Sequence, residues 1–529
     1  MKQIWLKKKN LLLAAFAALF LASCVEKFTD DYTWESSIRD RQLSNPKEVK
    51  YAFSPDGASQ TLTWSMVMGA GGYEVTVYIV DNPENPVVVG DSAQLVDGFT
   101  VTRPAKEDTR YRVEVRTLPN EKMNNTVNPA EQPTLLNYNN LVAEYATIPD
   151  GTDLHAYFTS NPVPQDSLFA IAYQLVGGGS YTMSGNVDVG GRDVIFRSTD
   201  NSNPPTITIS SGGFMSSGGM LRLHYLNIDH TDGFDAYTSS HALIRLNDVP
   251  APIAGEGRTS TYTSENGSTT TYVMIPSIVL RSCNAVNIKG RLLTGGLNNA
   301  RYAVAALIIE NSILGFNGKV NAAFIEINMR DAISGESVNG VGVVKDITVT
   351  NSTLFNTDPY AGEGTWEGQG RFWRQATQAS AVGGGSAWGN QTITLLNNTF
   401  WQMGPRSQSG NGTARTGTIR SNVFINSFGA AWGVINDMVF RSNNVVSGAN
   451  TTWYDAKWTG FGLGDNSRSF EGSIHAINSN EVSTNVNPII TDPEFTVNVA
   501  DIRNPVFSMG EGTTQVRRRT GDPRWLPQQ

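Results

Sequence analysis

One short pattern recurs through the second half of this 529-residue chain, and it restricts the fold more than any other feature. Each copy has an asparagine that is followed within a few residues by apolar residues. The copies are Ile309–Leu314, Val349–Leu354, Leu395–Phe400, Arg420–Phe424 and Arg441–Val446. Late copies follow one another at 22 to 24 residues, and earlier copies at 40 to 46. Long insertions, or a more divergent copy in between, account for the longer intervals.

A repeat of about 22 residues with short apolar runs is typical of a solenoid, in which each coil buries its apolar face only when the next coil stacks on it. After the N-terminus no long segment has helical periodicity, so we expect an all-β chain. We predict a right-handed parallel β-helix for residues 150–529. The asparagines are expected at one corner, because asparagine tolerates left-handed backbone angles and its amide can bond to the next coil.

The N-terminus has the features of an export signal. A basic start precedes an apolar run from Leu11 to Leu21, and the tetrapeptide Leu21-Ala22-Ser23-Cys24 ends that run. This order is typical of a bacterial lipoprotein signal. A transmembrane anchor is the alternative, but it needs about 20 apolar residues and this run is shorter. We therefore predict a signal peptide at 1–23 and lipidation of Cys24, whose acyl chains would hold the mature protein to a membrane.

Residues 24–48 are expected to form the lipidated N-terminus and a linker. The acidic residues Glu26, Asp30 and Asp31 follow the cysteine closely. They resemble the surface-export signal of outer-membrane lipoproteins of the Bacteroidetes type. That resemblance implies an outer-membrane protein exposed at the cell surface, whereas an ordinary solvated linker is the alternative.

Residues 49–149 alternate apolar and polar residues in short blocks that Gly, Pro, Asn and Asp interrupt, which predicts a β-sandwich. Trp64, Tyr73 and the segment Tyr111–Val115 lie at the positions of three strands. Their order and spacing resemble a fibronectin type III domain, in which these residue types form the core. The resemblance implies a spacer or docking module without chemistry of its own.

Charge and cysteine content exclude some classes of protein. The chain has 40 basic and 48 acidic residues, a net charge of −8, and no long basic run that could follow a phosphate backbone. Nucleic acid is therefore not an expected partner. Only Cys24 and Cys283 are present, so a lipidated Cys24 leaves Cys283 without an intrachain partner, and we expect Cys283 to pack as a buried thiol.

Two resemblances concern the second half of the chain. The stretches Leu168–Ile171, Val194–Ser198 and Pro204–Ile209 resemble the opening coils of the pectate-lyase-like β-helix superfamily. The whole arrangement, including the terminal segments Asp492–Phe495 and Gly521–Trp525, resembles a group of surface lipoproteins encoded in polysaccharide-utilisation loci. That second resemblance implies a role with glycans, but it implies no mechanism.

Three aspartates form the densest carboxylate group, Asp229, Asp232 and Asp235, directly after an apolar run. Such carboxylates can supply the hard oxygen ligands that Ca²⁺ prefers. The lyase family uses this ion to hold a uronate carboxylate, and its motifs are similar here, although compressed and with Asn227 where a Trp is usual. The family's Arg-x-Pro-x-x-Arg pattern, which carries the base, does not occur, nor do the Gly-His-Gly and Arg-Ile-Lys patterns of the related hydrolases. A polar turn is thus favoured over a calcium site.

Aromatic and basic residues gather in the interruption between residues 358 and 391. Eight of the 11 tryptophans lie from Trp366 to Trp525. Aromatic rings stack on sugar faces, and arginine pairs with uronate carboxylates. We expect a Gly-rich loop that binds glycan; the alternative is that the rings only cover strands and fill loop cores. The candidate residues are Trp366, Arg371, Phe372, Trp373, Arg374 and Trp388, with Trp453, Tyr454, Trp458 and Phe461 as a second group.

These observations leave three functions open. The first is a cell-surface lipoprotein that binds an acidic or pectin-like polysaccharide, with the membrane and other glycan-uptake proteins as further partners. The second is a polysaccharide lyase or glycoside hydrolase that acts on pectin-like chains, with Ca²⁺ at Asp229, Asp232 and Asp235 and an unlocated base. The third is a structural or adhesive surface protein. The missing catalytic motifs favour binding over catalysis.

Overall fold

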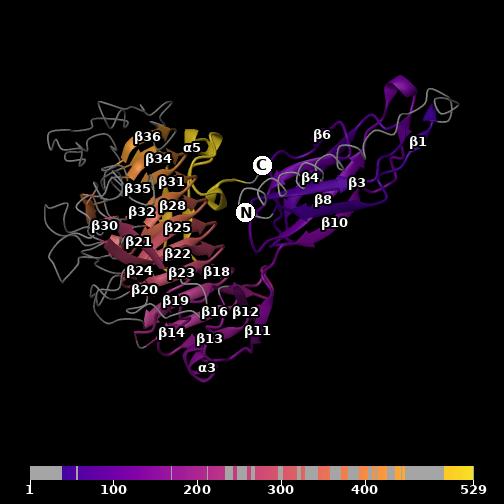
Figure 1. The fold of residues 1–529 in the computed structure, drawn as a ribbon. Helices are drawn as coiled ribbons and strands as arrows, with labels where there is room; N and C mark the ends of the chain where they lie inside the picture. Colours follow the sequence, from indigo (N-terminus) through magenta and orange to yellow (C-terminus); the bar gives the residue numbers. More distant parts are fainter. Residues whose placement is uncertain are drawn as a thin grey trace. The chain divides into compact units, whose positions relative to one another are not determined.

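A computed structural model describes the chain. The residues it describes are 38–54, 57–167, 169–210, 212–232, 242–246, 259–263, 269–295, 302–317, 323–327, 344–357, 371–378, 392–402, 408–411, 414–425, 435–441, 444–446 and 494–527. Cys24 and the signal segment lie outside these residues. The chain divides into two compact units, residues 1–141 and 142–529. Figure 1 shows the elements of each unit.

The first unit contains two antiparallel sheets. One sheet has the order β2 (Val49–Phe53), β3 (Ser59–Trp64), β7 (Thr100–Pro104). The other has the order β10 (Thr134–Asn139), β8 (Arg110–Thr117), β4 (Tyr73–Ile79), β5 (Val87–Val88), with β6 (Gln94–Val96) also paired to β4. A short parallel pair, β1 (Gln42–Leu43) and β9 (Thr126–Val127), and the 3-10 helix η1 (Glu121–Met123) complete the unit.

Alternating residues of these strands form one core. Trp64, Tyr73, Tyr111, Val113 and Val115 are all buried, as the sequence pattern predicted. The rings of Trp64 and Tyr73 meet edge to face with centroids 5.4 Å apart. The fibronectin type III resemblance itself stays a prediction.

The second unit contains three stacked parallel sheets. The first sheet has the strands β11 (Glu144–Ile148), β12 (Ile171–Leu175), β15 (Val194–Ser198), β18 (Leu221–His224), β22 (Thr269–Arg281), β25 (Tyr302–Glu310), β28 (Val344–Thr350), β31 (Thr392–Leu396), β34 (Ala414–Arg420) and β36 (Ile435–Arg441), and β21 (Thr259–Thr263) pairs antiparallel with β22. The second has β13 (Ser180–Met183), β16 (Thr206–Ser210), β19 (Asn227–Asp232), β23 (Asn284–Ile288), β26 (Ile313–Phe316), β29 (Thr353–Asn356), β32 (Thr399–Trp401), β35 (Val423–Ile425) and β37 (Asn444–Val446). The third has β14 (Val187–Asp188), β17 (Met215–Ser217), β20 (Ala242–Leu246), β24 (Arg291–Gly295), β27 (Ala323–Ile327), β30 (Arg371–Gln378) and β33 (Gln408–Asn411).

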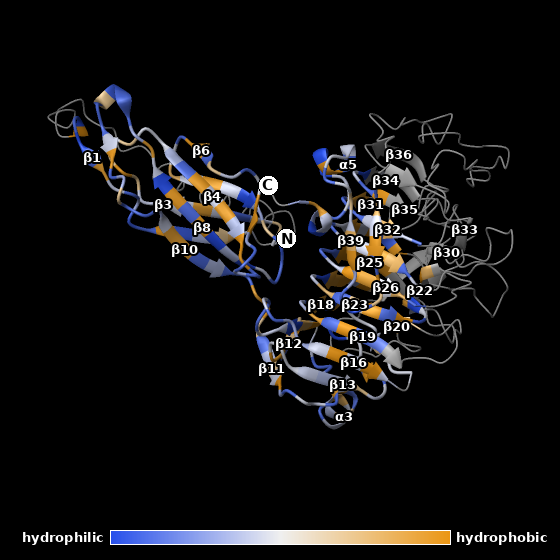
Figure 2. Ribbon diagram, turned by 180° about the vertical axis from the view of Figure 1, so that it is seen from behind, coloured by the Kyte–Doolittle hydropathy of each residue, from blue (hydrophilic) through white to orange (hydrophobic). Residues whose placement is uncertain are grey.

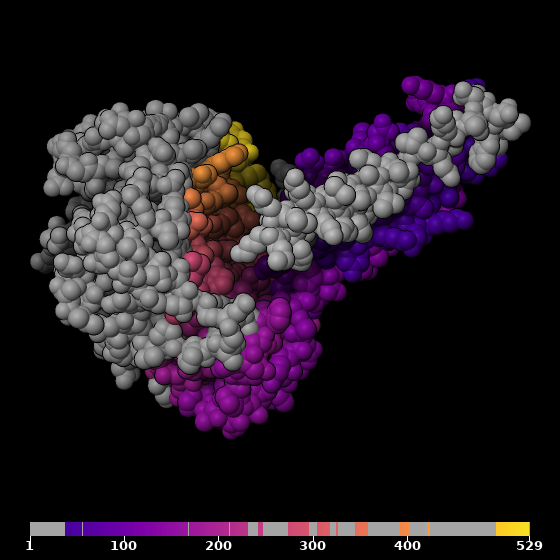
Figure 3. Space-filling view, in the orientation of Figure 1, coloured from indigo at the N-terminus to yellow at the C-terminus, as the bar shows by residue number. Residues whose placement is uncertain are grey.

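The chain visits these sheets in a fixed order, and each strand pairs in parallel with the strand one coil later. The coils therefore stack in sequence order, as the colour gradient on the visible face of Figure 3 shows. This arrangement confirms the predicted all-β class and the parallel β-helix.

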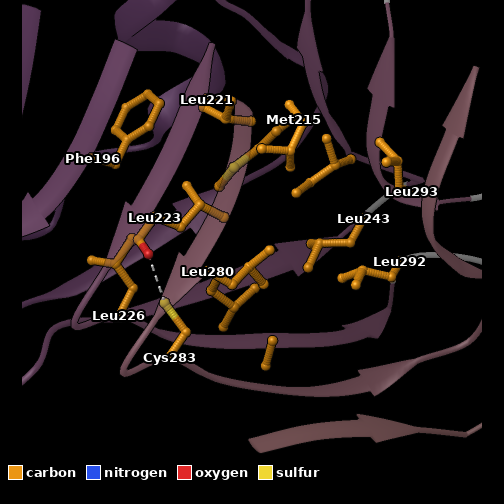
Figure 4. Close-up of a cluster of buried hydrophobic side chains, with 14 of the residues drawn as sticks. Phe196, Met215, Leu221, Leu223, Leu226, Leu243, Leu280, Cys283, Leu292 and Leu293 are labelled. Atoms are coloured by element: carbon orange, nitrogen blue, oxygen red, sulfur yellow. Dashed lines mark hydrogen bonds between the residues drawn. The ribbon is translucent and has the colours of Figure 1, made fainter. Parts of the chain in front are cut away.

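The interior of the β-helix is apolar along its length. Leu223, Leu280 and Phe196 are fully buried in one continuous core, and the apolar strand residues follow it in Figure 2. Cys283 lies in this core with its Sγ 3.2 Å from the carbonyl oxygen of Leu223 (Figure 4). The prediction of a buried thiol is confirmed. Truncating a fully buried aromatic side chain such as Phe196 to alanine is expected to cost about 3–5 kcal/mol.

The first coil begins before the predicted boundary at residue 150. Strand β11 already pairs with β12, so residues 142–149 contribute to the second unit. The helix α3 (Leu154–Ser160) follows, with the Asp153 side chain accepting a hydrogen bond from the backbone N–H of Ala156 at 2.8 Å. Leu154 and Phe158 face the core. The helix packs on β13 and β14, at the N-terminal end of the solenoid (Figure 1).

The corner between the first and second sheets contains two ladders, not one. The outer positions have left-handed backbone angles, with φ between 48° and 56°, at Tyr225, Ser282, Asn311, Asn351, Asn397 and Ser421. The inner positions are the buried residues Cys283, Ser312, Ser352, Asn398 and Asn422. Each inner side chain after Cys283 accepts the backbone N–H of the inner residue one coil earlier. Matching the repeat copies by their asparagines treats Asn311 and Asn422 as equivalent, which is wrong because they belong to different ladders.

Candidate functional site

Asp229 is the member of the predicted calcium group that the structure describes best. It lies on β19 and is only 3% exposed. Its Oδ1 accepts a hydrogen bond from Asn287 Nδ2 at 2.7 Å, and its Oδ2 forms an ion pair with Arg503 Nε. This hydrogen bond to Asp229 raises the pKa of Arg503. Both carboxylate oxygens thus have protein partners.

The structure places the backbone of only one of the other two aspartates. Asp232 ends the same strand, β19, and Asp235 lies outside the described residues. In the part of the chain that the structure describes, no group of three or more His, Cys, Asp or Glu side chains could hold a metal ion. Asp229 therefore serves as an attachment point for the C-terminal part of the chain.

That C-terminal part, residues 494–527, is here called the C-terminal clasp. It contains the antiparallel pair β38 (Thr496–Asn498) and β39 (Val506–Ser508), the helix α5 (Thr514–Arg517) and the 3-10 helix η5 (Pro523–Trp525). Its attachments to the β-helix run from β19 to β35. Beyond Asp229, Arg503 accepts through its carbonyl oxygen from Asn284 Nδ2 on β23, at 2.8 Å.

Apolar contacts hold the middle of the clasp. The ring of Phe507 on β39 lies 5.4 Å from Phe355 on β29 and 6.3 Å from Trp401 on β32. Figure 2 shows β39 beside β32. Trp525 also contacts Phe507, with centroids 5.3 Å apart. The clasp therefore covers the outer face of the second sheet with aromatic rings.

The terminal Gly-Asp-Pro-Arg-Trp segment holds the clasp at the corner ladders. Asp522 is fully buried, accepts from Thr353 Oγ1 at 2.7 Å and forms an ion pair with Arg524. Arg524 also donates to the carbonyl oxygen of Ser312 at 2.7 Å. Trp525 Nε1 donates to Thr353 Oγ1 at 2.6 Å. These bonds tie adjacent coils together, so the segment has a structural role.

The predicted glycan loop has a different structure from the one expected. Arg371, Phe372, Trp373 and Arg374 do not lie in a loop, because they begin strand β30 of the third sheet. Trp366 and Trp388 lie outside the described residues, as does the second aromatic group from Trp453 to Phe461. The strong β propensity of two aromatic residues in succession, Phe372 and Trp373, was the signal for a strand.

Register divides the residues of β30 between two rows that cross the third sheet. One row is polar at every position: Asp188, Ser216, Arg245, Thr294, Glu326, Arg374 and Gln408. The neighbouring row is apolar: Val187, Met215, Ile244, Leu293, Ile325 and Trp373. Its first five members are at most 1% exposed. Arg374 thus continues the polar row. Trp373 continues the apolar row, whose members on the other strands lie in the core.

The polar row faces outward where it begins, since Asp188 is exposed between the buried residues Val187 and Val189. Further along, Ser216 and Thr294 are buried. Arg245 is partly buried, with its guanidinium carbon 5.0 Å from the ring centre of Phe214. With strands about 4.8 Å apart, seven positions extend over about 29 Å. Sequence reasoning missed this row, because its members lie on separate coils and only strand register relates them.

Long connections precede or follow several strands of the third sheet. Connections from the first to the second sheet have two residues in the later coils, as between β28 and β29. The connections at residues 328–343, 357–370 and 379–391 have 16, 14 and 13 residues, and all of them enter or leave β27 or β30. Binding residues are disproportionately found on long connections that a rigid scaffold positions. The surroundings of β30 are therefore the best candidate site, although the binding role of its residues stays a prediction.

A family model described as a domain of unknown function matches residues 1–177. No curated protein matches the chain. A crystal structure of pectate lyase PelI from Erwinia chrysanthemi in complex with tetragalacturonic acid matches at 11% sequence identity, covering 78% of this chain and 95% of that one, with a TM-score of 0.17. We infer nothing from a TM-score this low. The strand pairing itself defines the class of the protein, a parallel β-helix protein.

Proposed function

We propose that this protein is a lipid-anchored surface protein that binds an acidic polysaccharide along the third sheet of its β-helix. The observation that carries the proposal is the polar row that ends with Arg374 and Gln408. The row includes two arginines, Arg245 and Arg374, on strands of different coils, which suits a polymer that repeats carboxylate groups. Arginine can pair with a carboxylate through two parallel hydrogen bonds.

The state of Asp229 supports binding over calcium-assisted elimination. In a lyase this carboxylate would have to hold the ion, yet here it holds Arg503 and Asn287. The lyase or hydrolase alternative also lacks the family's catalytic patterns in the sequence. The proposal places the fibronectin-like module between the lipid on Cys24 and the β-helix, as a spacer at the cell surface. Among the described residues, no helix has both the length and the apolar character needed to cross a membrane.

The test compares Arg374→Ala with Lys345→Ala in gels that contain polygalacturonate. Lys345 lies on β28 of the first sheet, so its removal changes the net charge equally at another face. Loss of one charged hydrogen-bond partner is expected to weaken retention about tenfold for Arg374→Ala. Lys345→Ala should match the unaltered protein.

Equal retention of both variants would show that the third sheet is not the binding site. Assays for unsaturated uronate ends and for new reducing ends are made on the same polysaccharide. Unsaturated ends would identify a lyase, and new reducing ends alone a hydrolase. Absence of retention on every glycan would favour the structural or adhesive function.

A further inference from the structure

The C-terminal clasp exposes a cluster of arginines on one turn. Arg517, Arg518 and Arg519 are consecutive and all three are exposed. Beyond the N-terminal signal, the sequence has no other run of three basic residues, and the chain as a whole has a net charge of −8. Like charges in succession repel one another, so this local excess contrasts with the acidic rest of the protein.

The backbone that holds these arginines is fixed by buried neighbours. Gln515 and Thr520, on either side of the run, are fully buried. Arg519 has a left-handed φ of 53°. This conformation is uncommon for a residue other than glycine, asparagine or aspartate. The turn is thus positioned by packing, and it presents the arginines from a rigid support.

Tertiary structure adds a fourth arginine. The backbone N–H of Gly521 donates to the carbonyl oxygen of Ser421 at 2.9 Å. Arg420 precedes Ser421 and is exposed. One hydrogen bond therefore brings Arg420 close to the turn, although about a hundred residues separate them in the sequence. We call Arg420, Arg517, Arg518 and Arg519 the arginine cluster.

The contacts of the cluster differ from those of Arg524 in the same segment. Arg524 is engaged by the buried Asp522 and by backbone carbonyls. Arg519 Nη1 donates to the carbonyl oxygen of Pro527 at 2.9 Å, and Arg517 Nη2 donates to Thr514 Oγ1 at 3.3 Å. A guanidinium has five N–H donors, so one bond to a neutral oxygen leaves capacity for a carboxylate.

We propose that the arginine cluster is a second contact for carboxylated polysaccharide, in addition to the third sheet. This inference rests on the proposed function. An acidic protein repels a polyanion at long range, but screening limits that repulsion to about 8 Å at physiological ionic strength. A compact group of cations therefore attracts carboxylates locally. Two separate contacts with one polymer also raise the overall affinity, because the second contact forms at a high effective concentration.

The experiment uses the full chain with Arg517→Gln, Arg518→Gln and Arg519→Gln together. The control variant combines Arg39→Gln, Arg41→Gln and Lys47→Gln. These three basic residues of the first unit are exposed, so the control changes the net charge by the same amount. Retention is measured in gels with polygalacturonate and with a neutral galactan, at low and at physiological salt. If each arginine forms one exposed ion pair with a carboxylate, the clasp variant should bind polygalacturonate about tenfold more weakly, and this difference should be smaller at higher salt. The control variant should bind as the unaltered protein does.

Other outcomes overturn the inference and separate it from the proposed function. If both triple variants lose retention equally, net charge alone is responsible. If the clasp variant binds normally while Arg374→Ala does not, the third sheet binds glycan and the cluster has no part in it. If only binding to anionic lipid vesicles falls, the cluster contacts a membrane. If the unaltered protein binds no carboxylated glycan, the proposed function fails as well.

Discussion

Replacing Asp522 with alanine should loosen the coils that the C-terminal clasp holds. The Asp522 carboxylate is fully buried, accepts from Thr353 Oγ1 at 2.7 Å and pairs with the guanidinium of Arg524. Removing one member of a buried pair leaves the other charge uncompensated, which costs about 3–5 kcal/mol. Arg524 keeps 29% exposure of its side chain and its bond to Ser312, so water relieves part of this cost. We expect about 3 kcal/mol, at the lower end.

Backbone hydrogen exchange is the suitable assay, because a chain with two compact units need not unfold in a single transition. A loss of about 3 kcal/mol corresponds to exchange about a hundredfold faster in β26 and β29, if these strands exchange by release of the clasp. The matched control is Asp501→Ala, which removes a solvent-exposed carboxylate from the same segment. Equal protection of β26 and β29 in the two variants would refute the reasoning.

Three further predictions concern the β-helix. In the buried ladder, Asn398→Ala removes the acceptor for Ser352 N–H and the donor to two oxygens, so it should lower the urea concentration at the unfolding midpoint. Asn397→Gly changes a left-handed outer position and should leave that midpoint nearly unchanged. Burial raises the pKa of Cys283 from 9.0 to about 12, so the thiol should resist alkylation in the folded protein. The contribution of the protonated thiol to folding stability should be complete below pH 9 and disappear as the pH rises toward 12. If Asp229 is structural, addition of calcium should not change the melting temperature, whereas Arg503→Ala should lower the melting temperature. A calcium-dependent rise of the melting temperature in the unaltered protein would contradict the structural role of Asp229.

The repeat pattern was sufficient to predict the class of fold. A coil has to present apolar residues inward and turn at a fixed corner, so both requirements appear in the local sequence of each copy. The same pattern did not separate Asn397 from Asn398, because adjacent asparagines satisfy either position of the corner. The pairing of Thr399 with Val423 and the hydrogen bond from the Asn398 backbone N–H to Asn422 Oδ1 show that Asn398 and Asn422 share the inner ladder.

The candidate glycan residues show a second limit. A Gly-rich interruption with scattered aromatic residues predicted a loop, yet Arg371–Gln378 pairs with β27 and with β33 as a strand. The deciding factor was an available edge of the third sheet, which propensity within the segment does not reveal. The polar row that ends with Arg374 was equally invisible, since its members are separated by whole coils.

The sequence by itself therefore determined the repeating class of the protein, because the apolar period and the corner residues act within one coil. Only the tertiary structure decided the use of its charged residues. In the sequence Asp229 was a candidate metal ligand in a group for which a polar turn was favoured, whereas the structure pairs it with Arg503, 274 residues away. Asp522 and Arg524 likewise gained their role from carbonyl and hydroxyl groups more than 160 residues away. These partners depend on where the C-terminal clasp packs against the stacked coils. A local sequence pattern contains no information about that packing.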